Sequence, residues 1–370
     1  MKQDIVVVGG YGHVGGQICK MLGEVYPGRV YAAGRRLEQA ERFCQTMNGK
    51  VKPLQLATDE SVDWQWLERT KLVIMCIDQE SPAFARKCLM NGTHYVDISA
   101  KGSFLSQLEK LNAESCEATG LLSVGLAPGL TNLLAQKAKE AFDQADRIDI
   151  AIMLGLGDSH GKAAIEWTID QVNSRFEVMQ NNQLVAVDSF TDRQLTDFGS
   201  SLGKHVAYRF PFSDQQTLPR TLHVPTVATR LCFDSRWMTT SMALLRRMGI
   251  SRFLEKKAVR SLMIKLLSSL RIGTAQYAVK VDAYGSKEGE QKRVGLSLHG
   301  ENESLITAQV AAAVGASLYS SHLPTGVYHL DQLYELTNQA KTLYLQRKGT
   351  NDQFFISRSC AVNYGIHNDV

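Results

Sequence analysis

The chain has 370 residues, a length that predicts two domains rather than one. Hydrophobic residues make up 44% of it and charged residues 21%, which excludes the disordered and collagen-like classes. The net charge of +4 comes from 41 basic and 37 acidic residues, and this balance argues against a nucleic acid as partner. We therefore expect a folded protein that acts on a small-molecule substrate.

The seven cysteines are odd in number, widely scattered and without a CxxC pair, which predicts reduced thiols in a cytoplasmic protein. The first apolar run is too short for a signal peptide, and no later run is long enough to span a membrane. Neither HExxH nor paired CxxC occurs, so we expect no metal site.

Short apolar runs alternate with helix-sized segments in the first third of the chain, a pattern typical of a parallel sheet buried on both faces. The runs predict six strands, at residues 5–8, 30–33, 51–56, 72–77, 95–98 and 121–126. The segments between them predict helices at 14–22, 37–47, 83–90 and 105–119. The fold class is therefore α/β, with a Rossmann-type doubly wound sheet in residues 1–128.

A glycine-rich loop follows the first strand and opens a helix, where backbone N–H groups and the helix dipole would face a pyrophosphate. Alone, such a motif also closes ordinary turns, but this position predicts a dinucleotide site. We expect the first glycine of GxGxxG to allow the tight turn, the second to allow close approach and the third to let the helix pack. The predicted cofactor-binding residues here are Gly10, Tyr11, Gly12, His13, Val14 and Gly15.

The second strand ends in Gly34-Arg35-Arg36, where an NAD-binding domain usually places an acid for the ribose. Gly34 leaves room for a phosphate, and the two guanidiniums suit a phosphate dianion, so NADP is the expected cofactor. The alternative is that Arg35 and Arg36 are only the solvated start of the next helix, and NAD is then accepted as well.

Residues 93–99 read Thr-His-Tyr-Val-Asp-Ile-Ser, and residues 120–135 read Gly-Leu-Leu-Ser-Val-Gly-Leu-Ala-Pro-Gly-Leu-Thr-Asn-Leu-Leu-Ala. With the glycine loop, these segments resemble the saccharopine dehydrogenase-like family, which includes saccharopine reductases, carboxynorspermidine dehydrogenases and lysine 6-dehydrogenases. The resemblance is good over residues 4–140, thin from 150 to 300, and returns at 324–327. It implies a nucleotide domain of residues 1–128 completed by residues from about 320 to 370, with a substrate and dimerisation domain at 129–319.

Pro128 lies in a turn after the sixth strand that would cross the carboxyl edge of the sheet, where ligands bind; alternatively, it is only a turn at the domain boundary. The resemblance implies that Asn132, in the helix that follows, lies near the nicotinamide and the substrate. Asp97 ends the fifth strand and is a catalytic candidate for proton transfer; alternatively, it caps the following loop. Cys76 and Asp78 follow the fourth strand, a position that flanks the cofactor.

The pattern changes after residue 147 to alternating strands, which predicts a second α+β domain with a mixed or antiparallel sheet. Strands are expected at 148–152, 184–190, 206–210 and 222–233, a hairpin at 277–284 and 292–299, and helices at 163–179, 305–318 and 330–340.

His160, in a glycine-rich loop, is the second catalytic candidate because histidine titrates near neutral pH; alternatively, it is a surface histidine. Residues 242–272 predict a basic amphipathic helix with a solvated face, or one that docks to an anionic membrane surface or an acyl carrier.

Together these features predict an NADP-dependent oxidoreductase that transfers a hydride at the C–N centre of an amino-acid-derived substrate, in a homodimer. Arg175, Arg209 and Arg230 are candidates for binding its carboxylates. One alternative is an NADPH-dependent reductase of a lipid-linked enoyl or carbonyl group. Another is an NADP-binding protein without catalysis.

Overall fold

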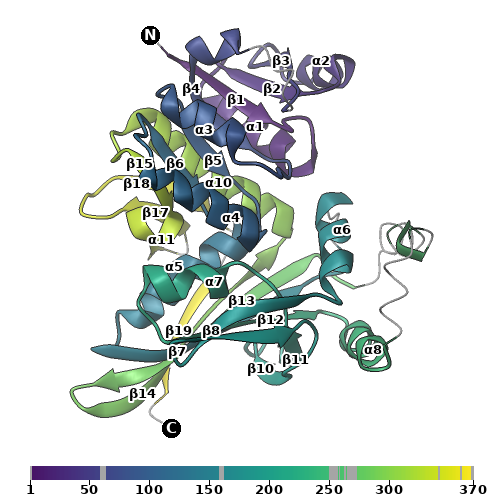
Figure 1. Cartoon of the computed structure of the whole chain (residues 1–370), viewed down its shortest axis with the longest axis vertical. Coiled ribbons are helices and arrows are strands. Elements are labelled where there is room, and N and C mark those ends of the chain that lie inside the picture. Colours follow the sequence, from purple (N-terminus) through teal and green to yellow (C-terminus); the bar gives the residue numbers. More distant parts are fainter. Residues whose placement is uncertain are drawn as a thin grey trace. The chain divides into compact units, whose positions relative to one another are not determined.

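The computed structural model describes residues 2–58, 64–157, 162–249, 257, 259–261, 264, 273–340, 342–358 and 361–367. It divides into two compact units (Figure 1). The first unit comprises Met1–Leu130, Ser304–Thr337 and Tyr344–Ser357. The second comprises Thr131–Glu303, Asn338–Leu343 and Arg358–Val370.

The first unit is built on a seven-stranded parallel sheet with the order β15-β6-β5-β4-β1-β2-β3. Its strands are β1 Asp4–Val8, β2 Val30–Gly34, β3 Val51–Gln55, β4 Thr70–Met75, β5 His94–Asp97, β6 Thr119–Leu122 and β15 Gly326–His329. Its longer helices are α1 His13–Val25, α2 Leu37–Gln45, α3 Ala83–Met90, α4 Gly102–Glu109 and α10 Glu303–Ser320, with short 3-10 turns at Gln65–Glu68 and Lys110–Ala113. The predicted Rossmann-type sheet and its six strands are confirmed.

Both faces of this sheet are covered by apolar side chains. Val6, Val73 and Met75 face a cluster formed with α3 and α4. On the other face, α10 packs closely, because a Cβ on Gly315 would lie 3.0 Å from the side chain of Ile74 and within 3.5 Å of Leu22. This double coverage explains why the strands read as continuous apolar runs.

The return of the chain to the first unit adds two elements that the sequence pattern did not place there. Helix α10 belongs to the first unit from Ser304 onward, and β15 pairs with β6 as a seventh strand. The last strand, β19 Ala361–His367, instead pairs with β14 in the second unit. The return therefore begins earlier than residue 320 and does not include the end of the chain.

The predicted helix at 330–340 is wrong beyond its first turn. Helix α11 is Leu330–Leu333, and β16 Tyr334–Gln339 follows, pairing with β17 Thr342–Arg347 and then β18 Gln353–Ser357. Tyr334 and Leu336 are buried while their neighbours are partly exposed, so the period is two rather than 3.6.

The second unit carries a mixed sheet with the order β10-β11-β12-β7-β13-β14-β19 and a separate hairpin, β8-β9. Its strands are β7 Gln144–Leu154, β8 Arg175–Gln180, β9 Gln183–Asp188, β10 Gln194–Asp197, β11 Lys204–Arg209, β12 Thr226–Phe233, β13 Gln276–Lys287 and β14 Glu290–Glu301. Its helices include α5 Thr131–Lys139, α6 Lys162–Gln171, α7 Asp214–Thr221 and α8 Arg236–Arg247. Among the described strands of this sheet, β12 and β7 are the only parallel pair, so the predicted mixed sheet and the predicted hairpin are confirmed.

The predicted helix at 163–179 is wrong in its second half, which forms β8. Asn181 and Asn182 follow with φ angles of 51° and 60°, and β9 then pairs with β8. Two consecutive left-handed residues make the tight turn that suits a hairpin, and asparagine adopts this conformation readily. The Asn-Asn pair was therefore a turn signal in the sequence.

Of the predicted basic helix at 242–272, the structure describes the first part, within α8, and a few later residues. Residues 250–256, 258, 262–263 and 265–272 lie outside the described residues. Within the described part of the chain, no helix is long and apolar enough to cross a membrane.

Candidate functional site

The glycine loop lies at the carboxyl end of β1, as expected. The glycine that makes the tight turn, however, is not the predicted Gly10. The left-handed residue is Gly9, with φ of 80°. Gly10 is instead crowded, because a Cβ there would lie 2.6 Å from the carbonyl oxygen of Val7. A Cβ on Gly15 would lie 2.3 Å from the carbonyl oxygen of Gly9, so Gly15 brings α1 against the loop as predicted.

Gly12 is the exposed glycine of this loop and directly precedes α1. A Cβ there would meet only the carbonyl oxygen of Gly9, at 3.1 Å, so the space beyond is open to a ligand. His13 and Val14 begin the helix, and the His13 ring lies 2.8 Å from the hydroxyl of Ser304. The loop therefore presents exposed backbone at the N-terminus of a 13-residue helix, an arrangement that favours an anion.

Tyr11 lies over the end of β2. Its hydroxyl accepts a hydrogen bond of 3.2 Å from the backbone N–H of Arg36, and a Cβ on Gly34 would lie 2.5–2.7 Å from the phenol. Tyr11 thus fills the space beside the buried Gly34, so the prediction that Gly34 leaves room for a phosphate is wrong. An acidic side chain at position 34 would collide with the same phenol. The side chains of Arg35 and Arg36 are both exposed beside this position, and the sequence did not indicate the contact with Tyr11.

The neighbouring strand ends carry Cys76, Asp78 and Asp97. Asp78 is exposed, whereas the half-buried Cys76 has a thiol whose pKa is raised strongly by burial. The Asp97 carboxylate is 1% exposed and accepts hydrogen bonds from the Tyr95 hydroxyl, at 2.7 Å, and from the Ser99 N–H, at 2.8 Å. Burial raises its pKa to about 6, although both hydrogen bonds act to lower it. Asp97 thus caps the loop after β5, and proton transfer by it stays a prediction.

The turn that contains Pro128 follows β6 and is held from two sides. The N–H of Leu130 donates to the carbonyl of Gly125 at 2.9 Å, and the N–H of Leu126 donates to the Thr307 hydroxyl of α10 at 3.2 Å. Pro128 is buried at the centre of this turn. Asn132, the second residue of the second unit, is fully buried and donates to the Thr217 hydroxyl at 3.5 Å. No motif in the sequence indicated that Thr307 would hold the turn.

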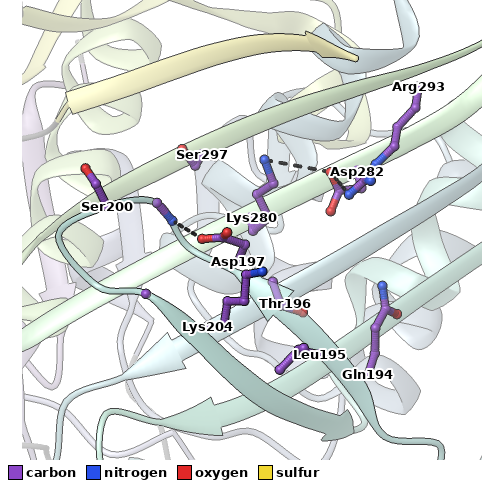
Figure 2. Close-up of a pocket in the computed structure, with 12 residues that line it drawn as sticks. Gln194, Leu195, Thr196, Asp197, Ser200, Lys204, Lys280, Asp282, Arg293 and Ser297 are labelled. Carbon is purple, nitrogen blue, oxygen red and sulfur yellow. Dashed lines mark hydrogen bonds and ion pairs between the residues drawn. The ribbon is translucent and has the colours of Figure 1, made fainter. Parts of the chain in front are cut away.

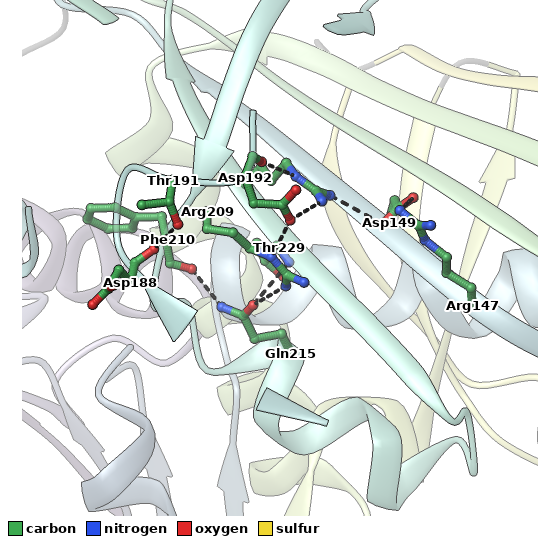
Figure 3. A network of polar contacts seen from close by, with 10 residues as sticks. Arg147, Asp149, Asp188, Thr191, Asp192, Arg209, Phe210, Gln215 and Thr229 are labelled. Atoms are coloured by element: carbon green, nitrogen blue, oxygen red, sulfur yellow. Dashed lines mark hydrogen bonds and ion pairs between the residues drawn. The ribbon is translucent and has the colours of Figure 1, made fainter. Parts of the chain in front are cut away.

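The second unit brings together two of the three arginines predicted to bind carboxylates (Figure 3). Arg209 of β11 and Arg230 of β12 are register partners, 5% and 4% exposed, and both contact the Asp192 carboxylate, at 3.0 and 2.6 Å. Burial acts to raise the pKa of Asp192, but the two guanidiniums hold it below its ordinary value. Arg175 lies exposed on β8 and does not join this cluster.

Further polar groups extend the arginine cluster along the sheet. Arg230 also contacts Asp149 at 3.2 Å, and Asp149 contacts Arg147 at 2.8 Å. Arg209 donates to the side-chain oxygen of Gln215 at 3.1 Å. In this cluster the two buried guanidiniums share one carboxylate that is itself half-exposed, Asp192. Such a pair can bind a second carboxylate bidentately.

A hollow of about 660 Å³ lies on the same unit, lined by β10, the loop after it, β13 and β14 (Figure 2). Lys280 and Arg293 converge on Asp282, at 3.7 and 3.1 Å. Asp282 is the register partner of Asp149, so the hollow and the arginine cluster share one face of the sheet. None of these residues was a predicted site residue, since 277–284 and 292–299 were expected only to form a hairpin.

His160, the second catalytic candidate, lies outside the described residues, as does the rest of 158–161.

Most of the first segment of the first unit matches a known protein-family model. Residues 5–123 match the family model described as the saccharopine dehydrogenase NADP binding domain. This match confirms the expected NADP-binding domain and runs from the first strand to the end of β6. No protein among the curated ones matches the chain.

Among solved structures, apo saccharopine dehydrogenase (L-Glu forming) from Saccharomyces cerevisiae has a similar fold, with a TM-score of 0.57 and 14% sequence identity. The similarity covers 88% of this chain and 94% of the yeast chain. DAP dehydrogenase from C. glutamicum, in complex with DAP, matches at a TM-score of 0.44 and 12% identity, over 89% of this chain and 93% of that one. The predicted resemblance is thus confirmed: residues 5–123 match the NADP-binding domain of saccharopine dehydrogenases, and the chain has a fold similar to that of the yeast enzyme.

Proposed function

We propose that this protein is an NADP-dependent oxidoreductase that transfers a hydride between NADPH and the C–N centre of an amino-acid-derived substrate. The observation that carries the proposal is the match of residues 5–123 to the NADP-binding domain of saccharopine dehydrogenases. The end of β2 supports it independently, because Gly34 is followed by two exposed arginines and no acid.

The residues of the first unit fit NADP chemically. The open backbone at Gly12 and the N-terminus of α1 would hold the pyrophosphate. Arg35 and Arg36 would bind the 2′-phosphate, which is a dianion suited to guanidinium forks. Tyr11 occupies the space that an acid at position 34 would need, which disfavours the pattern used for NAD.

The arginine cluster of the second unit supports a substrate with carboxylates. Arg209 and Arg230 are buried, so a carboxylate bound to them would be desolvated and strongly held. The yeast enzyme with a similar fold is described as L-Glu forming, and L-Glu is an amino acid that carries carboxylates.

When bound, NADPH supplies a hydride to the carbon of a C=N bond, and the nitrogen then needs one proton. Asp97 is our candidate for exchanging that proton, since burial raises its pKa to about 6 and keeps part of it protonated near neutral pH. Tyr95, whose hydroxyl donates to this carboxylate, would keep it oriented.

The cofactor assignment is tested by fluorescence titration of the purified protein with NADPH and NADH. We expect Arg35→Asp to weaken NADPH binding about 10- to 100-fold and to leave NADH binding nearly unchanged. Arg42→Asp is the matched control, because it makes the same charge change at an exposed position on α2. Equal losses in the two variants, or no NADPH binding by the wild type, would refute the assignment.

The reaction is tested by following NADPH oxidation in the presence of keto acids, amino acids and pairs of the two. We expect consumption only when both are present, since the C=N bond must form between them. Reduction of a keto acid alone would indicate C=O chemistry and contradict the proposal.

A second candidate function is NADP binding without catalysis. It is favoured by the state of Asp97, whose two carboxylate oxygens are both hydrogen bonded in a 1% exposed site. Between Val124 and Gly129, moreover, no side chain can exchange a proton. Tight NADPH binding with no turnover across the substrate pairs would favour this alternative.

A further inference from the structure

Three polar side chains from distant parts of the first unit form a hydrogen-bonded chain beside the turn that contains Pro128. Ser123 directly follows β6, His329 ends β15, and Glu109 ends α4. The Ser123 hydroxyl lies 2.8 Å from Nδ1 of His329, and Nε2 of the same ring lies 2.8 Å from a carboxylate oxygen of Glu109. We call these three residues the serine relay.

The proton positions in the serine relay follow from the chemistry of its ends. A carboxylate only accepts, so Nε2 of His329 carries a proton and donates to Glu109. In the neutral ring Nδ1 is then an acceptor, and the Ser123 hydroxyl donates to it. The relay runs from a fully buried hydroxyl, through a ring that is 4% exposed, to a carboxylate whose side chain is 26% exposed.

Ser123 has a backbone conformation that its residue type rarely adopts. Its φ is 56°, in the left-handed region that glycine occupies most easily. A glycine would therefore fit this backbone with less strain, which means that the serine contributes through its hydroxyl. Strained residues of this kind persist where the surroundings over-determine them, often at functional sites.

Ser123 belongs both to the serine relay and to the turn, of which it is the first residue. The carbonyl oxygen of Ser123 would lie 3.1 Å from a Cβ on Gly129, so the turn folds back directly against Ser123. Thr307 holds the same turn from α10 through the N–H of Leu126. The turn is therefore fixed by two segments of the C-terminal return, α10 and β15.

The same residue types activate serine nucleophiles in hydrolases. Here the Ser123 side chain is fully buried, so no substrate can reach its hydroxyl and an attacking role does not fit. Orientation does fit, because β6 lies beside β5 and both end at the carboxyl edge, where ligands of such sheets bind.

We propose that Ser123, His329 and Glu109 are positioning residues that hold the 123–130 turn in the shape needed by the nicotinamide end of NADPH. The proposal rests on the proposed function, since the turn serves a cofactor only if NADPH binds. It assigns a role in cofactor placement to β15 and α4, which carry none of the predicted site residues.

The test combines a ligand-free and a ligand-bound measurement. Hydrogen exchange at the amides of 124–130 reports on the turn itself, and fluorescence titration gives the Kd for NADPH. Ser123→Gly keeps the left-handed backbone and removes only the hydroxyl. We expect about tenfold faster exchange in the turn and an NADPH Kd raised by about the same factor.

His329→Asn separates the serine relay from helix capping. His329 is also the N-cap residue of α11, and its backbone N–H donates to the side-chain oxygen of Gln332 at 2.8 Å. Asparagine caps helices well but is too short to bridge Ser123 and Glu109. We expect the same effects as for Ser123→Gly, and no further loss in the double variant.

One variant should behave like the wild type. Tyr334→Phe removes another buried hydroxyl hydrogen bond of the first unit, of 2.8 Å to Ser317. It is the matched control for general loss of stability.

The positioning role would be overturned if Ser123→Gly showed the same exchange rates and the same NADPH Kd as the wild type. It would also be overturned if Tyr334→Phe changed both quantities as much as Ser123→Gly does. If the wild type itself failed to bind NADPH, the proposed function would fail and the role in cofactor placement would fail with it. Hydrogen exchange distinguishes these two failures, because it shows whether Ser123, His329 and Glu109 hold the turn even when no ligand binds.

Discussion

Asp97 is a buried acid whose protonation is coupled to folding. Its pKa in the folded protein is about 6, against 3.8 for an unperturbed aspartate, because burial disfavours the charged form. The folded state thus holds its proton more tightly than the unfolded state. Stability contributed by this group is fully present below pH 4 and is lost as pH rises through 6.

We therefore predict that Asp97→Asn changes the pH dependence of stability. A neutral amide has no charge to desolvate, so the variant should gain on the wild type by up to about 3 kcal/mol between pH 4 and pH 8. Thermal melts of both proteins across this range measure the difference. A difference that stays constant with pH would mean that Asp97 titrates normally in the folded state.

The glycine loop allows a matched pair of substitutions. Gly10→Ala places a methyl group 2.6 Å from the backbone of Val7, so we expect a loss of several degrees in Tm. Gly12→Ala meets only one atom, at 3.1 Å, and should fold nearly as well but weaken NADPH binding at least about tenfold. The prediction fails if Gly12→Ala binds NADPH as the wild type does.

At the scale of elements, the sequence predicted the parallel strands well because burial on both faces leaves continuous apolar runs. It failed where short segments have mixed composition, as at 175–180 and 334–339, since tertiary pairing decides between helix and strand there. The same distinction separates the site residues that could be predicted from those that could not. Residues on the glycine loop were predictable from local motifs, whereas Asp192 and His329 meet their partners only through sheet pairing.

The arginine cluster leads to a prediction about the loop before β10. Asp192→Gly keeps the left-handed backbone, whose φ is 47°, and removes the carboxylate that the buried guanidiniums of Arg209 and Arg230 share, which should destabilise the protein by about 3 kcal/mol. A carboxylate from solution could then take the vacant place. We expect glutarate to raise the Tm of this variant more than that of the wild type, with chloride at equal ionic strength as control. An equal response of the two proteins would show that the cluster does not accept external carboxylates.

At the scale of the whole molecule, the first unit depends on residues far along the chain. Helix α10 contributes Ile306, Val310, Val314 and Leu318, each 1% exposed or less, to the core. Each such side chain stabilises the fold by about 1.5–3 kcal/mol on burial. Their sum is at least about 6 kcal/mol, which is comparable to the entire stability of a typical domain. Without β15, moreover, β6 would become an open edge strand.

We therefore predict that residues 1–130 alone do not fold, although they contain all six strands and the glycine loop that the sequence indicated. The first unit should fold when residues 304–357 are joined to residue 130 by a short glycine-serine linker. The connection is feasible because the N–H of Leu126 and the hydroxyl of Thr307 are only 3.2 Å apart. Circular dichroism melts and NADPH titration of both proteins test this. A cooperative melt for residues 1–130 alone would show that α10 and β15 are dispensable, whereas NADPH binding by the linked protein would show that the first unit is a complete cofactor-binding domain.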